Sequence, residues 1–450
     1  MAKRGGPQEL GNERLGKLLV QYSVPAIVAT AAASIYNIID RIFIGQGVGP
    51  LAISGLALTF PLMNITAAFG SLVGVGAGTM VSIRLGQHDR KVATMILGNT
   101  VVLNVILSFI VGITFLIFLN PLLYAVGGSK DTLPYARDFM QVILMGNIFT
   151  HLYLGLNNIM RSSGYPTKAM ITTLITVAVN LILAPLFIFV FHWGIRGAAL
   201  ATVCAQICGT IWVVAHFTRI KSFLHFLPGY FRLKIEIIKD IFSIGLSNFL
   251  MLITASVVVL LFNLSLKKYG GDFAIGAFGI IGSIGNLVVM IVFGLNQGMQ
   301  PIAGYNYGAR KMSRVLRTFN LTVLAATIVT STGFVIVQLF PGFITSAFTT
   351  DTALANLARD GMRLYFIVFP IVGFQIVTSS FFQSIGKAQI SILLSLSRQV
   401  LFLIPALLIV PHFLLLKGVW LSAPVADFLA TIVTFFVLRW QLKRLRMLIK

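Results

Sequence analysis

Charged residues are scarce in this chain, and acidic residues are the scarcest. Asp, Glu, Lys and Arg make up 10% of the 450 residues, and Asp and Glu together number 12. A soluble domain typically contains about 25% charged residues, because its surface must interact with water. Since 57% of the residues are hydrophobic, the composition excludes a soluble globule and indicates a protein embedded in lipid.

Cysteines and catalytic motifs are also nearly absent. The two cysteines, Cys204 and Cys208, lie four positions apart in an apolar run, a spacing typical of neither a zinc site nor a disulfide framework. We identify no HExxH motif and no Ser-His-Asp arrangement, so the sequence favours neither an enzyme nor a bound cofactor. The first 17 residues are polar and basic, so we expect a mature start and not a signal peptide.

Long apolar runs fill most of the chain. A helix needs about 20 apolar residues to cross a bilayer core about 30 Å thick. Division of the sequence at its charged and Gly/Pro-rich breaks predicts twelve transmembrane helices in an all-α fold. They cover residues 17–44, 51–83, 92–119, 134–160, 167–191, 195–219, 236–266, 273–303, 315–340, 354–382, 388–416 and 418–440.

Basic residues gather in alternate loops between these runs. If the chain starts in the cytoplasm, most of its 34 Lys and Arg residues fall in cytoplasmic segments. Cytoplasmic loops of membrane proteins are enriched in Lys and Arg, so we expect both termini in the cytoplasm. The same distribution accounts for the net charge of +22 without a nucleic-acid partner.

The two halves of the chain repeat each other. The segment YARDFM, with Asp138, returns 222 positions later as LARDGM, with Asp360. Six helices per repeat, an even number, give both halves the same orientation, which predicts two pseudo-twofold six-helix bundles around a central cleft. The same offset relates Gly49 to Gly271, Gly76 to Gly298, Gly86 to Gly308, and Gly164 to Gly386.

This repeat sets the predicted domain boundaries. Two lobes of six helices are joined by a basic connector and flanked by polar ends. The predicted parts are a cytoplasmic N-terminal segment (1–16), an N-lobe (17–219), a cytoplasmic connector (220–235), a C-lobe (236–440) and a basic cytoplasmic tail (441–450).

Acidic residues inside the apolar runs are candidate functional residues, because a charge at the bilayer centre costs about 2.5–3.5 kcal/mol. Asp40 and Asp427 lie there, whereas the other acids fall in loops or at helix ends. Asp40 shares a helix face with Tyr36 and Asn37, and a buried carboxyl group is suited to take up and release a proton. The alternative is an acid at the outer interface, hydrogen-bonded or paired with a neighbouring Arg.

Asp427 closely follows Pro424 in the last apolar run. A proline within a helix frees a backbone carbonyl and leaves room for polar groups. Each half of the chain would then contribute one acid to the cleft, with Asp427 facing the substrate. The alternative is a structural ion pair between Asp427 and a partner such as Arg398 in the preceding run.

Uncharged polar residues supply further candidates for the cleft. They lie in several runs and together favour a polar cavity, although each alone is more typical of helix packing. The residues that we expect to line the substrate cleft besides Asp427 are Asn37, Asn157, Gln297, Gln300 and Gln383.

Two further patterns have structural interpretations. Gly70, Gly74 and Gly78 recur at every fourth position, which predicts close helix packing and not a phosphate-binding loop, since the P-loop Lys-Ser/Thr is missing. His151 is interpreted as a hydrogen-bonded residue of the bundle interior.

Seven longer segments of the sequence resemble the motifs of one known family. They are NIIDRIFIGQGVGPLAISG, GAGTMVSIRLG, IMRSSGYPTKAM, NLILAPLFIF, GIRGAALAT, GLNQGMQPIAGYNYGAR and GVWLSAPVAD. Together they span essentially the whole chain and resemble the multidrug and toxic compound extrusion (MATE) family, in particular its MepA-like branch. The resemblance implies two six-helix lobes around a cleft and rocker-switch export of amphipathic, usually cationic compounds, driven by inward movement of H+ or Na+.

The resemblance also implies roles for single residues. Asp40 matches the helix 1 acid on which ion coupling depends in several members, and Asp427 matches the acid of helix 12. Asn180 matches the Asn of the helix 5 motif, and Thr202 matches the helix 6 Thr near that Asn. Tyr36 completes our predicted ion-coupling set.

The chain departs from the family motif at one position that bears on the coupling ion. Where the family motif usually reads Asn-x-x-x-Asp-Pro, this chain has Ala184 before Pro185. A Na+ site at Asp40, Asn180 and Thr202 would lack that carboxylate, and such cations prefer several oxygen ligands. The sequence therefore favours H+ over Na+ as the coupling ion.

The hypothesis is a secondary active multidrug efflux antiporter that works as a monomer in the plasma (inner) membrane of a bacterium. Its expected partners are small organic cations or drugs and the lipid bilayer. The main alternative is a lipid-linked oligosaccharide flippase of the same architecture, which would need buried Arg or Lys in the cleft to hold a pyrophosphate. A passive channel or a membrane receptor is a further alternative, which would conduct current or carry no flux.

Overall fold

Helices account for nearly all of the computed structural model, which describes residues 6–220 and 222–447. Side chains are described in these ranges except at position 272 and at 444–447. No strand occurs in the described residues, which confirms the all-α prediction. Parts of the predicted N-terminal segment 1–16, connector 220–235 and tail 441–450 lie outside the described residues.

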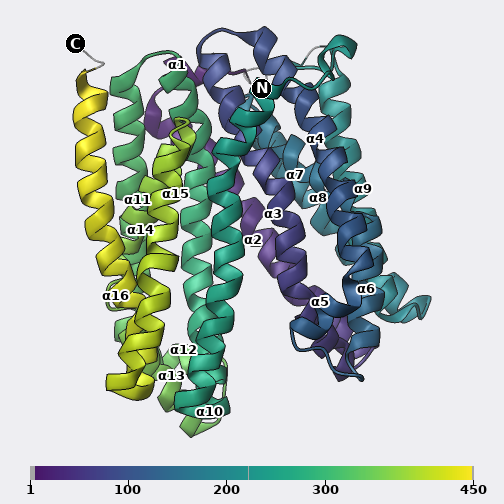
Figure 1. The fold of residues 1–450 in the computed structure, drawn as a ribbon, viewed down its shortest axis with the longest axis vertical. Coiled ribbons are helices and arrows are strands. Elements are labelled where there is room, and N and C mark those ends of the chain that lie inside the picture. The colour runs from purple at the N-terminus through teal and green to yellow at the C-terminus, as the bar shows by residue number, and fades with distance from the viewer. Residues whose placement is uncertain (1–5, 221, 448–450) are drawn as a thin grey trace. The chain divides into compact units, whose positions relative to one another are not determined.

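The helices follow the predicted apolar runs closely (Figure 1). Three short segments are not α-helical: η1 and η3 are π-helices, and η2 is a 3₁₀-helix. In chain order the elements are α1 (Glu9–Asn12), α2 (Leu15–Gly47), α3 (Pro50–Gly86), α4 (Arg90–Ile117), α5 (Leu119–Ala125), α6 (Leu133–Met145), α7 (Asn147–Ser162), α8 (Pro166–Pro185), η1 (Leu186–Val190), α9 (Gly194–Thr218), η2 (Pro228–Tyr230), α10 (Ile235–Gly308), α11 (Met312–Leu339), α12 (Pro341–Ser346), α13 (Thr352–Tyr365), α14 (Phe369–Ser384), α15 (Ala388–Leu396), η3 (Ser397–Leu403) and α16 (Ile404–Met447).

The described helices agree with twelve membrane spans. Nine stretches are long and apolar enough to cross a bilayer, and two bent pairs, α6 with α7 and α13 with α14, supply one span each. The last of the nine, Ala388–Lys443, has 56 residues, or about 84 Å of helix, nearly three bilayer cores. Because its backbone breaks at Leu415, where φ is 50° and ψ is −131°, it provides two spans.

The chain forms two compact units. The first contains Val28–Phe249 together with the described residues before Arg14, and the second contains Arg14–Ile27 together with the described chain from Leu250 onward. The first half of α2 thus packs within the second unit, and the first turns of α10 pack within the first. Each unit has its own apolar core.

The internal repeat is visible in the backbone. Gly164 and Gly386, which are 222 positions apart, both have positive φ, at 102° and 76°, and so do His88 and Arg310, at 61° and 57°. The bent pairs are also equivalent, with angles of 56° between α6 and α7 and 57° between α13 and α14. Equivalent irregularities in both halves indicate that the repeated sequence encodes one local structure twice.

Helices α3 and α7 of the first unit pack at a row of glycines. A Cβ atom at Gly70 would lie 3.0 Å from the His151 ring, and a Cβ atom at Gly74 would lie 3.0 Å from Gly155 Cα. At Gly78 it would lie 2.9 Å from Ser162 Oγ. His151 Nε2 lies 2.9 Å from the Thr66 carbonyl oxygen across the same contact. The predicted helix packing is therefore confirmed. His151 is hydrogen-bonded in the bundle interior through Nε2, whereas its Nδ1 atom has no partner among the described residues.

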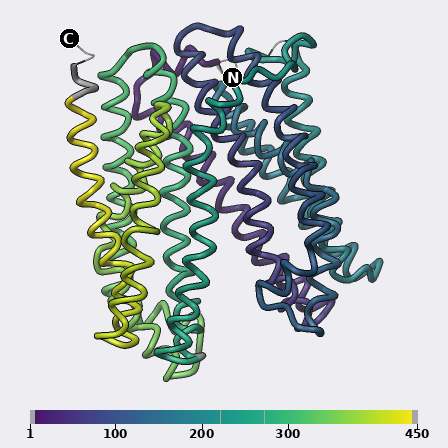
Figure 2. Tube along the Cα trace, in the orientation of Figure 1, coloured from purple at the N-terminus to yellow at the C-terminus, as the bar shows by residue number. Residues whose placement is uncertain are grey.

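The long helices of each unit run side by side, and their connections gather at the helix ends (Figure 2). In the first unit, α3 also approaches the start of α10 closely enough that glycine is required. A Cβ atom at Gly76 would lie 2.1 Å from the Ile241 carbonyl oxygen, and one at Gly245 would lie 1.8 Å from the Leu72 carbonyl oxygen.

We expect Gly76→Ala to destabilise the protein by about 1–3 kcal/mol, because the added methyl group meets backbone that no side-chain rotation can move. The matched variant is Gly282→Ala, since a Cβ atom at this helical glycine has nothing within 4 Å. Thermal melting in detergent should show a lower Tm for the first variant only. Equal melting temperatures for the two variants would contradict the close approach.

Candidate functional site

Asp40 is a buried acid on α2. Its relative exposure is 7%, and its Oδ1 atom has no hydrogen-bond partner among the described residues. The neighbouring Arg41 lies over the ring of Phe60, with 5.6 Å from Cζ to the ring centroid. Since a buried polar atom without a partner is costly, the oxygen marks a place where a proton or cation would be stabilised.

Two polar residues on neighbouring helices of the same unit bond directly to each other. Asn180 Nδ2 on α8 donates to Thr202 Oγ1 on α9 at 3.1 Å, and Thr202 Oγ1 in turn donates to the Ala198 carbonyl oxygen. Asn180 is buried, and its Oδ1 atom has no partner in the described residues. The pair therefore presents a second oxygen that is free to accept.

Tyr36 connects α2 to this pair. Its hydroxyl lies 3.5 Å from Thr202 Oγ1, and the side chain is half-buried. Tyr36 lies one helical turn before Asp40, so both residues are on one face of α2. The structure thus joins Tyr36, Asn180 and Thr202 of the predicted ion-coupling set through hydrogen-bonding contacts.

One apolar cluster lies next to Asp40, Asn180 and Thr202 along their helices. Ile44, Ala184 and Ala198 are buried members of one cluster, and each lies one helical turn from Asp40, Asn180 or Thr202, respectively. Because residues four apart on a helix are neighbours on its surface, the three polar side chains border the same cluster. Ala184 is completely buried there. It stands at the sequence position where the motif Asn-x-x-x-Asp-Pro of the resembled family has Asp.

The local sequence explains how α8 and α9 come so close. The chain reverses between η1 and α9 through His192 and Gly194, which both have a φ of 56°. A Cβ atom at Gly197 would lie 3.1 Å from the Phe187 backbone, so a small residue is needed where the two elements meet. This hairpin brings Asn180 within hydrogen-bonding distance of Thr202.

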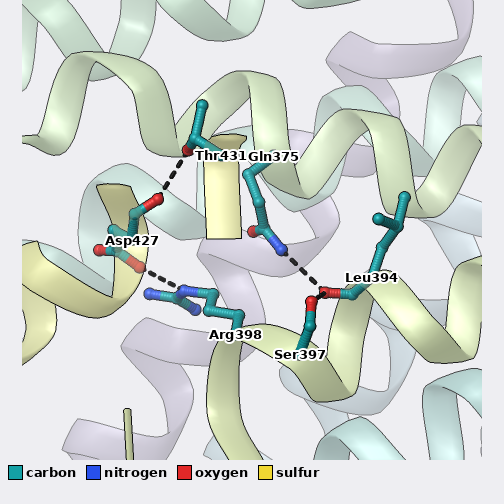
Figure 3. Close-up of polar contacts among 6 residues, drawn as sticks. All are labelled: Gln375, Leu394, Ser397, Arg398, Asp427 and Thr431. Carbon is teal, nitrogen blue, oxygen red and sulfur yellow. Dashed lines mark hydrogen bonds and ion pairs between the residues drawn. The ribbon is translucent and has the colours of Figure 1, made fainter. Parts of the chain in front are cut away.

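Asp427 in the second unit has a different environment. Arg398 Nε on the π-helix η3 donates to Asp427 Oδ1 at 2.5 Å (Figure 3). The side chains are 27% and 11% exposed, respectively. The structure therefore contains the ion pair considered as the alternative to a substrate-facing Asp427, and it neutralises both charges locally.

Other polar groups around this pair bond to the backbone. Gln375 Nε2 and Ser397 Oγ both donate to the Leu394 carbonyl oxygen, and Thr431 Oγ1 donates to the Asp427 carbonyl oxygen (Figure 3). These bonds use donors that would otherwise be unsatisfied within the bundle.

The remaining cleft candidates lie in separate places. Gln300 Nε2 donates to Gln383 Oε1 at 3.3 Å within the second unit, and Gln297 is half-buried near Gln300 along α10. In the first unit, Asn157 on α7 is buried with an unpartnered Oδ1 atom. The exposed Asn37 donates to the Ala33 carbonyl oxygen of its own helix.

Two further buried polar residues lie outside the predicted ion-coupling and cleft sets, although Asn296 belongs to the polar residues that favoured a polar cavity in the sequence. Asn296 on α10 is 3% exposed, and neither its Oδ1 nor its Nδ2 atom has a partner among the described residues. Asn99 on α4 is buried and donates to the Arg232 carbonyl oxygen, while its Oδ1 atom accepts from Lys234 N–H. Spacing along a helix gives no signal for Asn99, because its backbone partners lie far away along the chain.

Among the described residues, no group of three or more His, Cys, Asp or Glu side chains could hold a metal ion. The predicted ion-coupling residues of the first unit instead supply one carboxylate, one amide and two hydroxyl groups. Such a set can bind a proton on the carboxylate, and carboxylate and carbonyl oxygens are also the ligand types that hard cations prefer.

Comparison with known proteins agrees with this architecture. The family model MatE matches residues 25–186 and 248–408, one match in each half of the chain. The multidrug export protein MepA of Staphylococcus haemolyticus is 26% identical over 421 residues, which cover 94% of this chain and 92% of the relative.

Solved structures show the same fold. A multidrug resistance MATE family transporter of the MOP superfamily, in an outward-facing conformation, is similar with a TM-score of 0.93 and 23% identity, covering 99% of this chain and 100% of the other. A MOP superfamily transporter from Pyrococcus furiosus Vc1 gives a TM-score of 0.91 and 24% identity, with 100% of both chains covered. Because the family model covers most of the sequence and both of its repeats, the chain belongs to the MATE family of membrane transporters.

Proposed function

We propose that the protein is a secondary active antiporter that exports amphipathic, mostly cationic organic compounds in exchange for H+. The observation that carries this proposal is the buried Asp40, whose Oδ1 atom has no partner among the described residues. It lies one helical turn after Tyr36, whose hydroxyl is 3.5 Å from Thr202 Oγ1 in the hydrogen-bonded pair of Asn180 and Thr202. A buried acid that is not neutralised by a neighbouring base can alternate between a protonated and a charged form.

The proposed cycle couples these two forms to the drug. Proton binding removes the charge of Asp40, lowers the affinity for an organic cation and favours return to the inward-open state. Release of the proton restores the charge that attracts the next cation. Access would alternate by a rocker-switch motion of the two halves, as expected for transporters built from repeats.

The side chains around Asp40 have specific parts in this cycle. The unpartnered Asn180 Oδ1 atom can accept the hydrogen bond of a protonated carboxyl group. The Tyr36 hydroxyl can donate to the charged form when it leaves its contact with Thr202 Oγ1. Thr202 holds the Asn180 amide in one orientation, because its hydroxyl accepts from Nδ2. Each form of Asp40 would then find a partner, which keeps the energy difference between the two forms small.

Export can be measured in an efflux-deficient bacterium. We expect expression to raise resistance to ethidium and to lower its accumulation, and we expect a protonophore to abolish both effects. Resistance that survives the protonophore in Na+-free medium would contradict H+ coupling. Binding and transport of a pyrophosphate-linked lipid without any ethidium export would instead indicate a flippase.

Ala184 provides a test of ion choice. Ala184→Asp adds a carboxylate one helical turn from Asn180, at a position buried in the apolar cluster that borders Asp40. We expect a Na+ gradient to drive ethidium export by this variant but not by the parent protein, because Na+ prefers several oxygen ligands. Ala184→Asn is the matched control, since it adds a polar group without charge. A folded Ala184→Asp variant that is indifferent to Na+ would contradict this interpretation of the site.

A further inference from the structure

An apolar groove lies between α14 and α16 in the second unit. Its volume is about 600 Å³, and it is lined by Ile371 and Phe374 from α14 and by Phe428, Thr431 and Phe435 from α16, together with two further apolar residues. The Thr431 hydroxyl already donates to the Asp427 carbonyl oxygen of its own helix. The groove therefore offers almost no hydrogen-bonding capacity, which excludes a polar ligand within it.

The groove is open to the surface of the second unit. Phe428, Phe435 and Phe436 are 53%, 52% and 63% exposed, although they lie within a stretch long and apolar enough to cross a membrane. Such side chains contact lipid when the protein is in a bilayer. A hollow between two lipid-facing helices holds an acyl chain more closely than a smooth helix surface does, because it offers contacts on both sides.

Basic residues lie beyond the groove, toward the C-terminal end of α16. Arg439 and Lys443 are exposed and lie four and eight positions after Phe435, on the same helix face. Trp440 lies between them and is 51% exposed, as is typical of tryptophan at a membrane interface. Residues 439–450 contain five Lys or Arg and no acid, a pattern that favours anionic lipid.

We propose that this groove binds one acyl chain of an anionic phospholipid, whose phosphate is held by Arg439 and Lys443. The lengths agree: Phe428 and Arg439 are eleven residues apart, about 16 Å along a helix, and one leaflet of a bilayer core is about 15 Å thick. The basic end of α16 then lies at the level of the lipid headgroups. By the positive-inside prediction this is the cytoplasmic leaflet.

The charge pattern argues against other occupants. An organic cation that entered the groove would be repelled by Arg439 and Lys443, and a second copy of the chain would bring the same basic end against itself. An anionic headgroup gains about 1 kcal/mol for each Lys or Arg near the membrane surface, which corresponds to about a fivefold preference for each cation.

Spin-labelled lipids test this site on the full-length protein in liposomes. Phosphatidylglycerol and phosphatidylcholine, each labelled near the end of one acyl chain, report the fraction of lipid immobilised by the protein. We expect phosphatidylglycerol to associate at least about fivefold more strongly. Arg439→Gln with Lys443→Gln should reduce this preference to near unity. The matched control, Lys91→Gln with Lys239→Gln, removes two exposed cations of the first unit and should leave the preference unchanged.

The groove itself is tested by filling it. Thr431→Trp should lower the immobilised fraction of both lipids, because the larger side chain occupies the space of the acyl chain. Thermal melting identifies the variants that remain folded. Equal association of the two lipids with the parent protein, equal loss in both charge variants, or an unchanged immobilised fraction in folded Thr431→Trp would each overturn the proposal.

Discussion

Replacement of Asp40 by Asn is expected to reduce pH-driven export of ethidium to the background of vesicles that lack the protein. Asn has the size of Asp and can bond to the same neighbours, but it cannot exchange a proton. Asp40 is a buried acid of the first unit with an unpartnered oxygen, and its replacement removes the group that is protonated in the proposed cycle. Everted membrane vesicles with an imposed pH gradient provide the measurement.

Asp138→Asn is the matched control for this variant. Asp138 belongs to the same unit, but it pairs with the exposed Arg196 at 2.8 Å, where water screens the charge and the pair contributes little. We expect its export rate to stay close to that of the parent protein. Full activity of Asp40→Asn would exclude Asp40 as the coupling residue, and equal loss in both variants would indicate a general effect of removing acids.

The second large effect is expected from breaking the pair of Arg398 and Asp427. Asp427→Leu leaves the Arg398 guanidinium without the partner that it contacts at 2.5 Å, in a segment with the length and composition of a membrane span. Removal of one member of a buried ion pair costs about 3–5 kcal/mol, because the remaining charge is uncompensated. Thermal melting in detergent should show a large decrease in Tm.

The double variant Arg398→Met with Asp427→Leu separates the loss of a pair from the loss of a charge. Apolar residues of similar size often replace a buried ion pair without loss of stability, so we expect the double variant to recover most of the Tm. The coupling between the two positions follows from the complete double-mutant cycle. Additive effects of the two single variants would show that the pair is not a unit. Export by a stable double variant would show that Asp427 is not required for substrate binding.

Much of the helical framework is predictable from the sequence. Apolar runs fix which residues cross the bilayer, and the glycines of the repeat identify the irregular positions, such as Gly164 and Gly386, which both adopt positive φ. The break at Leu415 lies within two residues of the predicted boundary between 388–416 and 418–440, which the charged and Gly-containing Lys417-Gly418 marks. That a leucine takes the positive φ there was not predictable, since leucine rarely adopts it.

The site was predictable in its members but not in its contacts. An acid in an apolar run is conspicuous, and the resemblance added Asn180 and Thr202 to Asp40. That Asn180 donates to Thr202 and keeps its own oxygen free depends on the approach of α8 and α9. Asn99 was unpredictable for the same reason, because its backbone partners lie more than 130 positions away along the chain.

The ion pair between Asp427 and Arg398 could not be predicted from the positions of charged residues in the sequence alone. The sequence shows an acid in one apolar run and an arginine in the preceding one, which is compatible with either a substrate site or a structural pair. Only the position of Arg398 on η3 places its guanidinium against Asp427 (Figure 3). A π-helical segment shifts the side chains that follow it around the helix axis, and apolar spacing does not reveal such a shift.

Proton movement driven by the drug alone is the most direct test of the proposed exchange. The purified protein is reconstituted into liposomes with a pH-sensitive dye inside, in Na+-free potassium buffer with valinomycin and without a pH gradient, and ethidium is added outside. Exchange predicts that the lumen becomes alkaline as ethidium enters, and that Asp40→Asn shows neither change. Ethidium entry through the parent protein with a constant internal pH would contradict the account.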